Sequence, residues 1–269
     1  METNTSAAKR KPRLILFFMA AFVFAGLIAV IWLGLHQLTK PKQIAPPDFG
    51  AISNVKEKKK AFFSFVLPMV ERSNDMVMQE RNELNRIAIT VRQGDDLTEA
   101  YTARLDELAV KYRSHAQQTP QATIDALNKR IDTIPTSLAL AQAANESAWG
   151  TARFALQGNN YFGIWCWTKN CGLVPEARSA GAKHEVASFS SVQNSIDYYI
   201  LMLNSHPAYA QLREIRYTLR QKNLPITGTS LSQGLLSYSE RREQYVEEIN
   251  AMIRINDLET RTDPGEAGD

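Results

Sequence analysis

Apolar residues recur at a spacing of three and four over the first half of the chain. The segment FFSFVLPMVERSNDMVMQERNELNRIAITVRQG, residues 62–94, follows this pattern and predicts a long helix that ends at Gly94. DLTEAYTARLDELAVKYR predicts a second helix over residues 96–113, and residues 122–131 predict a third. We favour the interpretation that residues 61–130 form helices that support the domain after them. An arm that binds a partner protein is the alternative.

The pattern changes after Pro135. The segment SLALAQAANESAWG, residues 137–150, is rich in strong helix formers, and Thr136 precedes it as a candidate N-cap. Its small apolar side chains on one face predict a central helix. Residues 162–189 predict short strands instead, because IWCW and HEVASF partly alternate around the turn TKNCG. In the next helical segment, Ile196, Tyr199 and Leu203 are predicted to supply core. The chain is therefore expected to be mainly α, in an α+β arrangement.

A different pattern occupies the N-terminus, where Leu14 to Leu35 form an uncharged apolar run of 22 residues. As a helix this run would extend ~33 Å, enough to cross a hydrocarbon core of about 30 Å. A cleaved signal peptide is the alternative, but its apolar region is usually shorter, about 7–15 residues. We favour an uncleaved, single-pass signal anchor in a bacterial inner membrane. Basic residues at positions 9, 10, 11 and 13 would stay on the cytoplasmic side and place the rest in the periplasm.

These patterns divide the chain into six expected regions. Residues 1–13 are a cytoplasmic basic N-terminus, and 14–35 are the transmembrane anchor. Residues 36–60 carry three prolines and a cluster of lysines, which predicts a tether. The helical supporting region covers 61–130, a catalytic domain covers 131–258, and 259–269 are predicted to be a disordered tail.

Composition and charge exclude some functions. The chain has 269 residues, a hydrophobic fraction of 44% and a formal net charge of only +3, with much of the excess at the N-terminus. Nothing in this balance indicates nucleic acid as a partner. The four histidines are scattered without the spacing of a metal site, so we expect no metal, no cofactor and no zinc-dependent amidase chemistry.

Two cysteines, Cys166 and Cys171, are the only ones in the chain. Their separation of five positions is one that a tight loop can close as a disulfide, which would suit an exported protein. Free thiols are the alternative that remains open. A metal site is less favoured, because His184 is the only nearby histidine.

Candidate chemistry begins with Glu146, near the C-terminal end of the predicted Ala-rich helix. The helix dipole does not favour a negative charge there, and apolar neighbours disfavour it further, so the pKa of this carboxyl should be raised. A carboxyl that holds its proton can serve as the general acid of glycosidic cleavage. An ordinary solvated glutamate is the alternative when the residue is considered by itself.

The surroundings of Glu146 resemble a known family. ALAQAANESAWGTARFALQGNNYFGIW is similar to the catalytic segment of glycoside hydrolase family 73, bacterial N-acetylglucosaminidases that cut peptidoglycan, and the resemblance covers roughly residues 131–256. It implies a lysozyme-like helical domain with a small β-hairpin lobe and a cleft between them. It also implies hydrolysis of the β-1,4 bond after N-acetylglucosamine in the glycan strands of peptidoglycan, with Glu146 as the general acid.

The resemblance assigns further residues to the site. Beside Glu146 it places a saccharide groove formed by Asn160, Tyr161, Phe162 and Trp165, although each aromatic ring by itself could be core. It implies a second carboxylate on the hairpin that contacts the substrate, with Glu176 as the first candidate for the catalytic role and Glu185 as the second candidate and a substrate contact. Tyr238 is expected to face the active site.

Several alternatives stay open at this point. Tyr245 falls on the next helix and is predicted to be a packing residue. The sequence does not fix a retaining, an inverting or a substrate-assisted mechanism, and we favour the last two. A lytic transglycosylase also has a lysozyme-like fold with a glutamate before a serine, although GNNYFGI, residues 158–164, favours family 73. A noncatalytic module that binds the cell wall is the alternative from another class.

Overall fold

A computed structural model describes residues 45–114, 118–176, 178 and 181–261. The predicted anchor Leu14–Leu35 lies outside these residues and stays a prediction, as does the part of the predicted tail after residue 261. None of the helices among the described residues has the length and apolar character of a membrane span.

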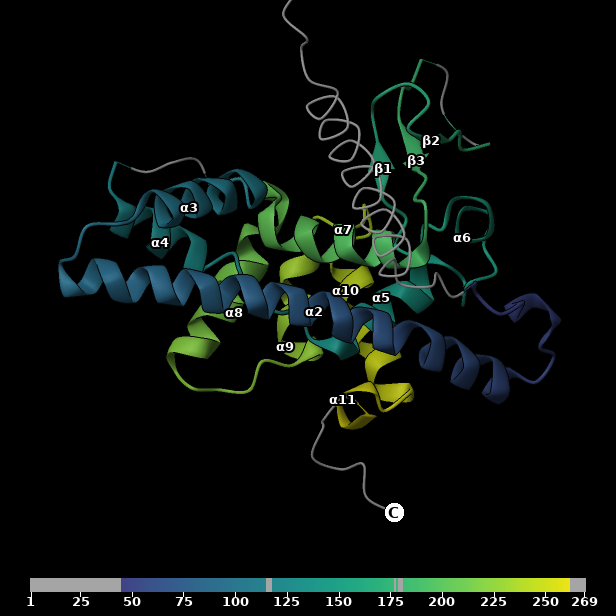
Figure 1. Cartoon of the computed structure of the whole chain (residues 1–269). Helices are drawn as coiled ribbons and strands as arrows, with labels where there is room; N and C mark the ends of the chain where they lie inside the picture. The colour runs from purple at the N-terminus through teal and green to yellow at the C-terminus, as the bar shows by residue number, and fades with distance from the viewer. Residues whose placement is uncertain (1–44, 115–117, 177, 179–180, 262–269) are drawn as a thin grey trace, which may run out of the picture. The chain divides into compact units, whose positions relative to one another are not determined.

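The described chain is mainly helical and carries one small three-stranded sheet, which confirms that part of the expected fold class (Figure 1). The helices are α2 (Val55–Gln93), α3 (Glu99–Lys111), α4 (Pro120–Asn128), α5 (Thr136–Glu146), α6 (Arg153–Gly158), α7 (Val192–Ser205), α8 (Ala210–Gln221), α9 (Gly228–Ser232), α10 (Glu243–Ile255) and α11 (Leu258–Arg261). Three 3-10 turns are η1 (Phe49–Ala51), η2 (Pro207–Tyr209) and η3 (Gln233–Leu235). The strands are β1 (Trp165–Cys166), β2 (Gly172–Leu173) and β3 (Glu185–Ala187).

Helix α2 has defined signals at both ends. The side chain of Asn54 accepts a hydrogen bond from the Glu57 N–H at 3.1 Å and caps the start, and Gly94 ends the helix with a φ of 79°, as predicted. The start differs from the prediction, because the expected tether 36–60 overlaps η1 and the first turns of α2. Phe49 of η1 is only 1% exposed and its ring lies 5.5 Å from that of Phe62, so the folded part begins within the predicted tether.

The predicted boundary near residue 130 does not divide the structure. Helix α2 contacts α4, α5 and α7, and apolar residues from all four share one hydrophobic core (Figure 1). The described residues from Pro46 onward belong to one compact unit. The helices of region 61–130 are therefore part of the domain that holds Glu146.

Two arginines of α8 hold the loop that leads into α5. Arg216 of α8 is 1% exposed and donates to the backbone oxygens of Asp132 and Thr133, both at 3.0 Å. Arg220 donates to the two carboxylate oxygens of Asp132 at 2.6 and 2.7 Å. Buried polar groups are stable only when they are paired in this way. The loop is thereby fixed to α8, and the start of α5 is fixed with it.

Helix α5 is central, as predicted from its small side chains. It contacts α2, α9, α10 and α11, and Leu138, Ala141 and Ala144 are 0% exposed. The predicted N-cap was wrong, because Thr136 is the first helical residue and no side chain caps this end. The carbonyl oxygen of Pro135 instead accepts the first N–H bonds of the helix.

The small sheet has the strand order β1-β3-β2, and both pairings are antiparallel. Cys166 and Cys171 form a disulfide, as predicted, which joins the end of β1 to the residue before β2. The carboxylate of Glu185 in β3 accepts the N–H groups of Asn170 and Gly172 at 3.1 and 2.8 Å. The connection between β1 and β2 is therefore held both covalently and by hydrogen bonds.

Candidate active site

Glu146 is the last residue of α5, and an unusual turn follows it. The next three residues after Ser147 all have a positive φ: 48° at Ala148, 62° at Trp149 and 78° at Gly150. The hydroxyl of Ser147 is fully buried, donates to the Ala143 carbonyl at 2.6 Å and accepts from the Gly150 N–H at 2.8 Å. The Glu-Ser-x-Trp-Gly motif thus ends the helix abruptly, with Ser147 holding the strained turn.

The last two residues of this turn fit closely against the N-terminal helices. A Cβ atom on Gly150 would lie 2.4 Å from the Phe49 ring, so only glycine fits there. The Trp149 ring lies 5.6 Å from that of Phe62 and 5.3 Å from that of Phe63. Trp149 is therefore a packing residue, and the turn after Glu146 rests on residues 49–63.

The carboxyl of Glu146 lies in a largely buried environment. Burial raises its pKa above the usual range, in the direction predicted from the sequence. Hydrogen bonds from the side chains of Tyr245 and Asn145 lower the pKa of Glu146 in part, and the positive charge of Arg241 acts in the same direction. Glu248, which pairs with Arg241, raises it. Desolvation is the largest of these effects, so Glu146 holds its proton more tightly than an exposed glutamate does.

A chain of hydrogen bonds leads to Glu146 from the core. The Tyr199 hydroxyl donates to the Gln142 side-chain oxygen at 2.7 Å, and the Gln142 amide nitrogen donates to the Tyr245 hydroxyl at 2.9 Å. All three side chains are 0% exposed. Because the Tyr245 hydroxyl accepts from Gln142, its own proton is available to the nearby Glu146 carboxyl, whose pKa it lowers.

Sequence analysis missed this arrangement and assigned Tyr245 to packing alone. One signal was available, because Gln142 stands four residues before Glu146 and so shares its helix face. A glutamine within a run of small apolar residues needs a buried polar partner. The sequence did not say which residue supplied that partner.

Tyr238 lies in the same cluster, as predicted, but its hydroxyl has a structural partner. It donates to the backbone oxygen of Phe162 at 2.8 Å, and its ring stacks on that of Tyr245 with centroids 5.4 Å apart. Burial raises the pKa of Tyr238 well above the usual range, and the nearby charges of Tyr245 and Glu146 add to this effect. Tyr238 therefore connects the loop at residues 162–163 to the Tyr245 side of the site.

Gly163 brings this loop next to the acid. It has a φ of 62°, and a Cβ atom added there would lie 3.1 Å from the Glu146 Oε2 atom. A side chain at position 163 would crowd the carboxyl oxygen, and the left-handed backbone disfavours one in any case. The glycine of the Tyr-Phe-Gly-Ile segment thus leaves the Glu146 oxygen free on this side.

Three of the predicted sugar contacts were wrong, because the structure buries them. Asn160 is 1% exposed and bonds only to backbone, donating to the Ile164 and Ala187 oxygens and accepting from Phe162 and Ile164. Tyr161 is 1% exposed and stacks on Phe62 at 6.0 Å. Phe162 is 0% exposed and stacks on Tyr199 at 3.9 Å. These side chains shape the loop and leave no ring face for a sugar.

The remaining predicted contacts lie on the β lobe. Trp165 is 48% exposed, so its ring is accessible. Glu185 is 6% exposed with both carboxylate oxygens bonded to backbone N–H groups, which lower its pKa below the usual range, so the prediction that it contacts substrate was wrong. The side chain of Glu176 is 85% exposed and lies 3.5 Å from the Arg153 guanidinium.

The predicted core residues of α7 are found where expected, since Ile196, Tyr199 and Leu203 are all 0% exposed. The search of the described residues for metal ligands gave one grouping, Cys166, Cys171 and Glu185. The two sulfurs form the disulfide, so they offer no thiolate to a metal at this place.

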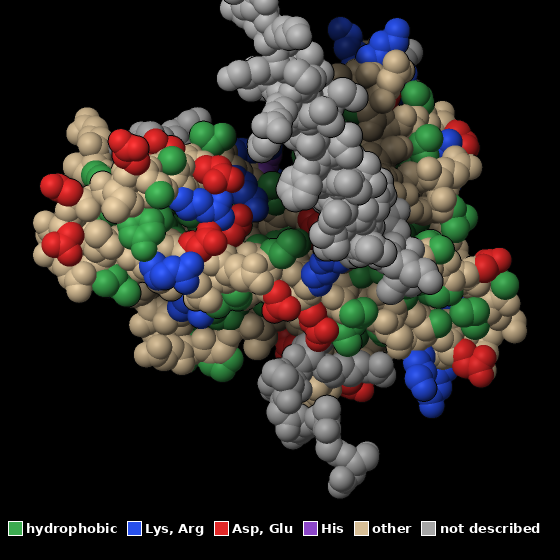
Figure 2. Space-filling view, viewed as in Figure 1, with side chains coloured by type: hydrophobic (Ala, Val, Ile, Leu, Met, Phe, Trp, Pro, Cys, Tyr) green, Lys and Arg blue, Asp and Glu red, His purple; other side chains and the backbone are tan. Residues whose placement is uncertain are grey.

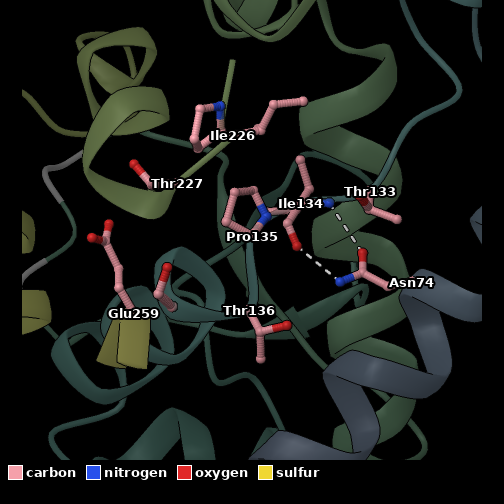
Figure 3. A pocket seen from close by; sticks show the side chains of 10 residues that line it. Asn74, Thr133, Ile134, Pro135, Thr136, Ile226, Thr227 and Glu259 are labelled. Carbon is pink, nitrogen blue, oxygen red and sulfur yellow. Dashed lines mark hydrogen bonds between the residues drawn. The ribbon is translucent and has the colours of Figure 1, made fainter. Parts of the chain in front are cut away.

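A cavity of about 380 Å³ lies at the other end of α5 (Figure 3). It is lined by residues 133–137, by Pro225, Ile226, Thr227 and Glu259, and by Asn74, whose amide bonds both backbone groups of Ile134. Helix α5 has 11 residues, so its ends at Thr136 and Glu146 lie about 15 Å apart along the helix axis. This cavity is therefore separate from the site of the acid. Glu259 lies in α11, which corrects the predicted start of the tail.

Comparisons with known proteins agree with the motif. A family model described as "Glucosaminidase: Mannosyl-glycoprotein endo-beta-N-acetylglucosaminidase" matches residues 121–258. "Protein bax" from Escherichia coli (strain K12) is 32% identical over 216 residues, covering 80% of this chain and 76% of that protein. The crystal structure of the catalytic domain of the autolysin Auto from Listeria monocytogenes aligns with a TM-score of 0.42 and 14% identity, over 78% of this chain and 91% of that one.

Proposed function

This chain belongs to the glucosaminidase family of glycoside hydrolases, and we propose that it hydrolyses the β-1,4 bond after N-acetylglucosamine in peptidoglycan. One observation carries the proposal. The chain places a largely buried glutamate, with a raised pKa and a tyrosine donor beside it, at the end of the helix within the family match. A proton-carrying carboxyl is what the departure of a sugar oxygen requires.

In this mechanism Glu146 acts as the general acid. It transfers its proton to the glycosidic oxygen as the bond to the sugar carbon breaks, and it becomes a carboxylate. The Tyr245 hydroxyl then donates to a charged oxygen, a hydrogen bond that is stronger than the one to the neutral acid. Gly163 leaves space beside Oε2 for the leaving oxygen to approach.

Of the two candidates for a second catalytic carboxylate, we favour Glu176. Glu185 is committed to the hairpin backbone, whereas the exposed side chain of Glu176 is free to meet a substrate. We propose that Glu176 serves as this group if the enzyme does not use the N-acetyl group of the substrate itself. Glu176→Gln separates the two routes, since a drop in kcat of a hundredfold or more is expected for an enzymatic carboxylate. Unchanged kcat would instead support substrate-assisted chemistry.

The N-terminal pattern supports a proposal for the cellular location. We propose that Leu14–Leu35 anchors the chain in the inner membrane with the enzyme in the periplasm, where peptidoglycan lies. Fractionation of cells that produce the full chain tests this. Recovery in the membrane fraction that persists after a high-salt wash is expected, and recovery in the soluble periplasmic fraction would indicate that the run is a cleaved signal.

The products decide the reaction. Purified peptidoglycan treated with the full chain should release fragments that end in reducing N-acetylglucosamine, as identified by mass spectrometry. Anhydromuramyl ends would mean that the enzyme is a lytic transglycosylase. Binding without any release would mean that the chain is a noncatalytic module of the cell wall.

A further inference from the structure

Exposed aromatic rings gather on the β lobe beyond Gly163. Trp165 is 48% exposed and Trp167 is 70% exposed, and the two stand two positions apart, a spacing that places side chains on one face of an extended strand. The His184 ring stacks on Trp165 with centroids 4.2 Å apart and an interplanar angle of 9°. One face of the Trp165 indole is thus covered by His184, and about half of the residue remains exposed.

The segment that carries these rings is held rigidly. Trp167 lies between the two cysteines of the disulfide, and the Glu185 carboxylate fixes the N–H groups of Asn170 and Gly172. A large aromatic side chain on a fixed backbone loses little conformational entropy when it binds a ligand. An exposed tryptophan on such a support is suited to binding, whereas core formation does not explain it.

The charge around these rings is positive. Lys169 and Lys183 are exposed, and within the described residues neither forms an ion pair. Figure 2 shows Lys and Arg side chains at the outer end of the β lobe. The acidic residues of the lobe do not pair with these lysines, because Glu176 lies beside Arg153 and Glu185 bonds the backbone. An anionic partner would therefore meet unpaired positive charge here.

The exposed rings are also continuous with the site. Gly163 lies against Glu146, and Trp167 follows it by four residues, which extend at most about 13 Å at ~3.3 Å per residue. A polymer bound at Glu146 that continued along this strand would pass the rings within a few sugar units.

We propose that Trp165, Trp167, Lys169 and Lys183 form a platform that binds the peptidoglycan strand beyond the bond that is cut. The indole rings stack on sugar rings, and the lysines attract the carboxylates of the peptide stems. His184 is a positioning residue, because it acts through Trp165. The inference rests on the proposed function only in naming peptidoglycan as the polymer.

Co-sedimentation of the full chain with insoluble peptidoglycan tests the platform. Trp167→Ala is compared with Val110→Ala, an exposed apolar control on α3 that is 80% exposed, both in the Glu146→Gln background so that the polymer stays intact. We expect Kd to rise about threefold to tenfold for Trp167→Ala and to stay unchanged for the control. Trp167→Phe should restore most of the binding, since it retains a flat ring.

A second variant tests the charges. Lys169→Glu combined with Lys183→Glu should weaken binding at low salt, and the difference from the parent chain should shrink as salt is added. Two results would overturn the platform. One is equal binding by the Glu146→Gln chain with and without Trp167→Ala, and the other is absence of binding by the Glu146→Gln chain itself. Release of soluble fragments in the Glu146→Gln background would count against Glu146 as the general acid. The comparison of Kd values would still decide whether the platform binds peptidoglycan.

Discussion

The Gln142 amide donates to the Tyr245 hydroxyl at 2.9 Å, and this fixes Tyr245 as a donor to Glu146. Tyr199 fixes the orientation of the Gln142 amide in turn, because its hydroxyl donates to the Gln142 side-chain oxygen at 2.7 Å. The hydrogen bonds from Tyr199 through Gln142 to Tyr245 therefore all run outward from the core. We predict that this series of hydrogen bonds sets the proton affinity of Glu146.

Tyr245→Phe should move the alkaline limb of the pH profile to higher pH. The Tyr245 hydrogen bond lowers the pKa of Glu146, so its removal raises that pKa further and keeps the acid protonated at higher pH. The measurement is kcat/KM against pH on soluble muropeptides. Tyr161→Phe is the control, since Tyr161 is equally buried but packs against Phe62. An alkaline limb at the parent position in Tyr245→Phe would contradict the account.

Gln142→Leu should destabilise the fold, because it removes a partner from two buried hydroxyls. Each buried polar group left without a partner costs about 1–3 kcal/mol of unfolding free energy. Chemical denaturation of the single variants Gln142→Leu and Tyr199→Phe and of the double variant measures the coupling. The losses should be less than additive, since both changes break the same bond. Strict additivity would show that the Tyr199–Gln142 bond contributes no stability.

Gly163→Ala should reduce activity far more than Gly181→Ala. Both glycines have a positive φ, 62° and 86°, so both variants carry similar backbone strain. Only the Cβ at position 163 would meet the Glu146 Oε2, at 3.1 Å, whereas nothing lies within 4 Å of position 181. We expect kcat to fall about tenfold or more for Gly163→Ala and to stay near the parent value for Gly181→Ala. Equal activities would mean that the approach to Glu146 does not matter.

Glu146→Gln should stabilise the fold at neutral pH. The folded-state pKa of Glu146 is raised, so the folded chain binds the proton more tightly than the unfolded chain, and stability falls as pH rises through that pKa. The Glu146→Gln side chain has no proton to lose, so this variant does not lose stability in this way. The loss in the parent chain amounts to about 1.4 kcal/mol of unfolding free energy for each tenfold difference in proton affinity between the folded and unfolded states.

Thermal unfolding from pH 4 to pH 8 measures the difference between Glu146→Gln and the parent chain. The two Tm values should be close at the acid end, and the variant should unfold at a higher temperature, by roughly 2–4 °C per kcal/mol, at the alkaline end. A constant difference across this range would show that Glu146 does not hold its proton more tightly in the folded state.

Hydrophobic periodicity predicted most of the helices but not the functional cluster. The pattern over residues 62–94 and the stop at Gly94 were sufficient for α2 because local signals determine helix ends. The small side chains of α5 likewise predicted a central helix. The start of α2 was missed, because a cluster of lysines such as 58–60 is typical of a tether as well as of the first turns of a helix.

The site was harder to predict because its members are distant in sequence. Glu146 and its raised pKa followed from one helix, but Tyr245 reaches it from α10, about a hundred residues later. Tyr161 and Phe162 were predicted to contact sugar because they adjoin the motif. Their burial depends on Phe62 and Tyr199, which no local pattern associates with them.

The most direct test of the general-acid role compares kcat/KM on purified peptidoglycan for the parent chain, Glu146→Gln and Glu214→Gln. Glu214 is the control, because its exposed carboxylate on α8 pairs only with Lys129. The account predicts a loss of about 10²- to 10⁴-fold for Glu146→Gln, the contribution typical of a positioned acid, and no loss for Glu214→Gln. Full activity of a correctly folded Glu146→Gln chain would contradict it.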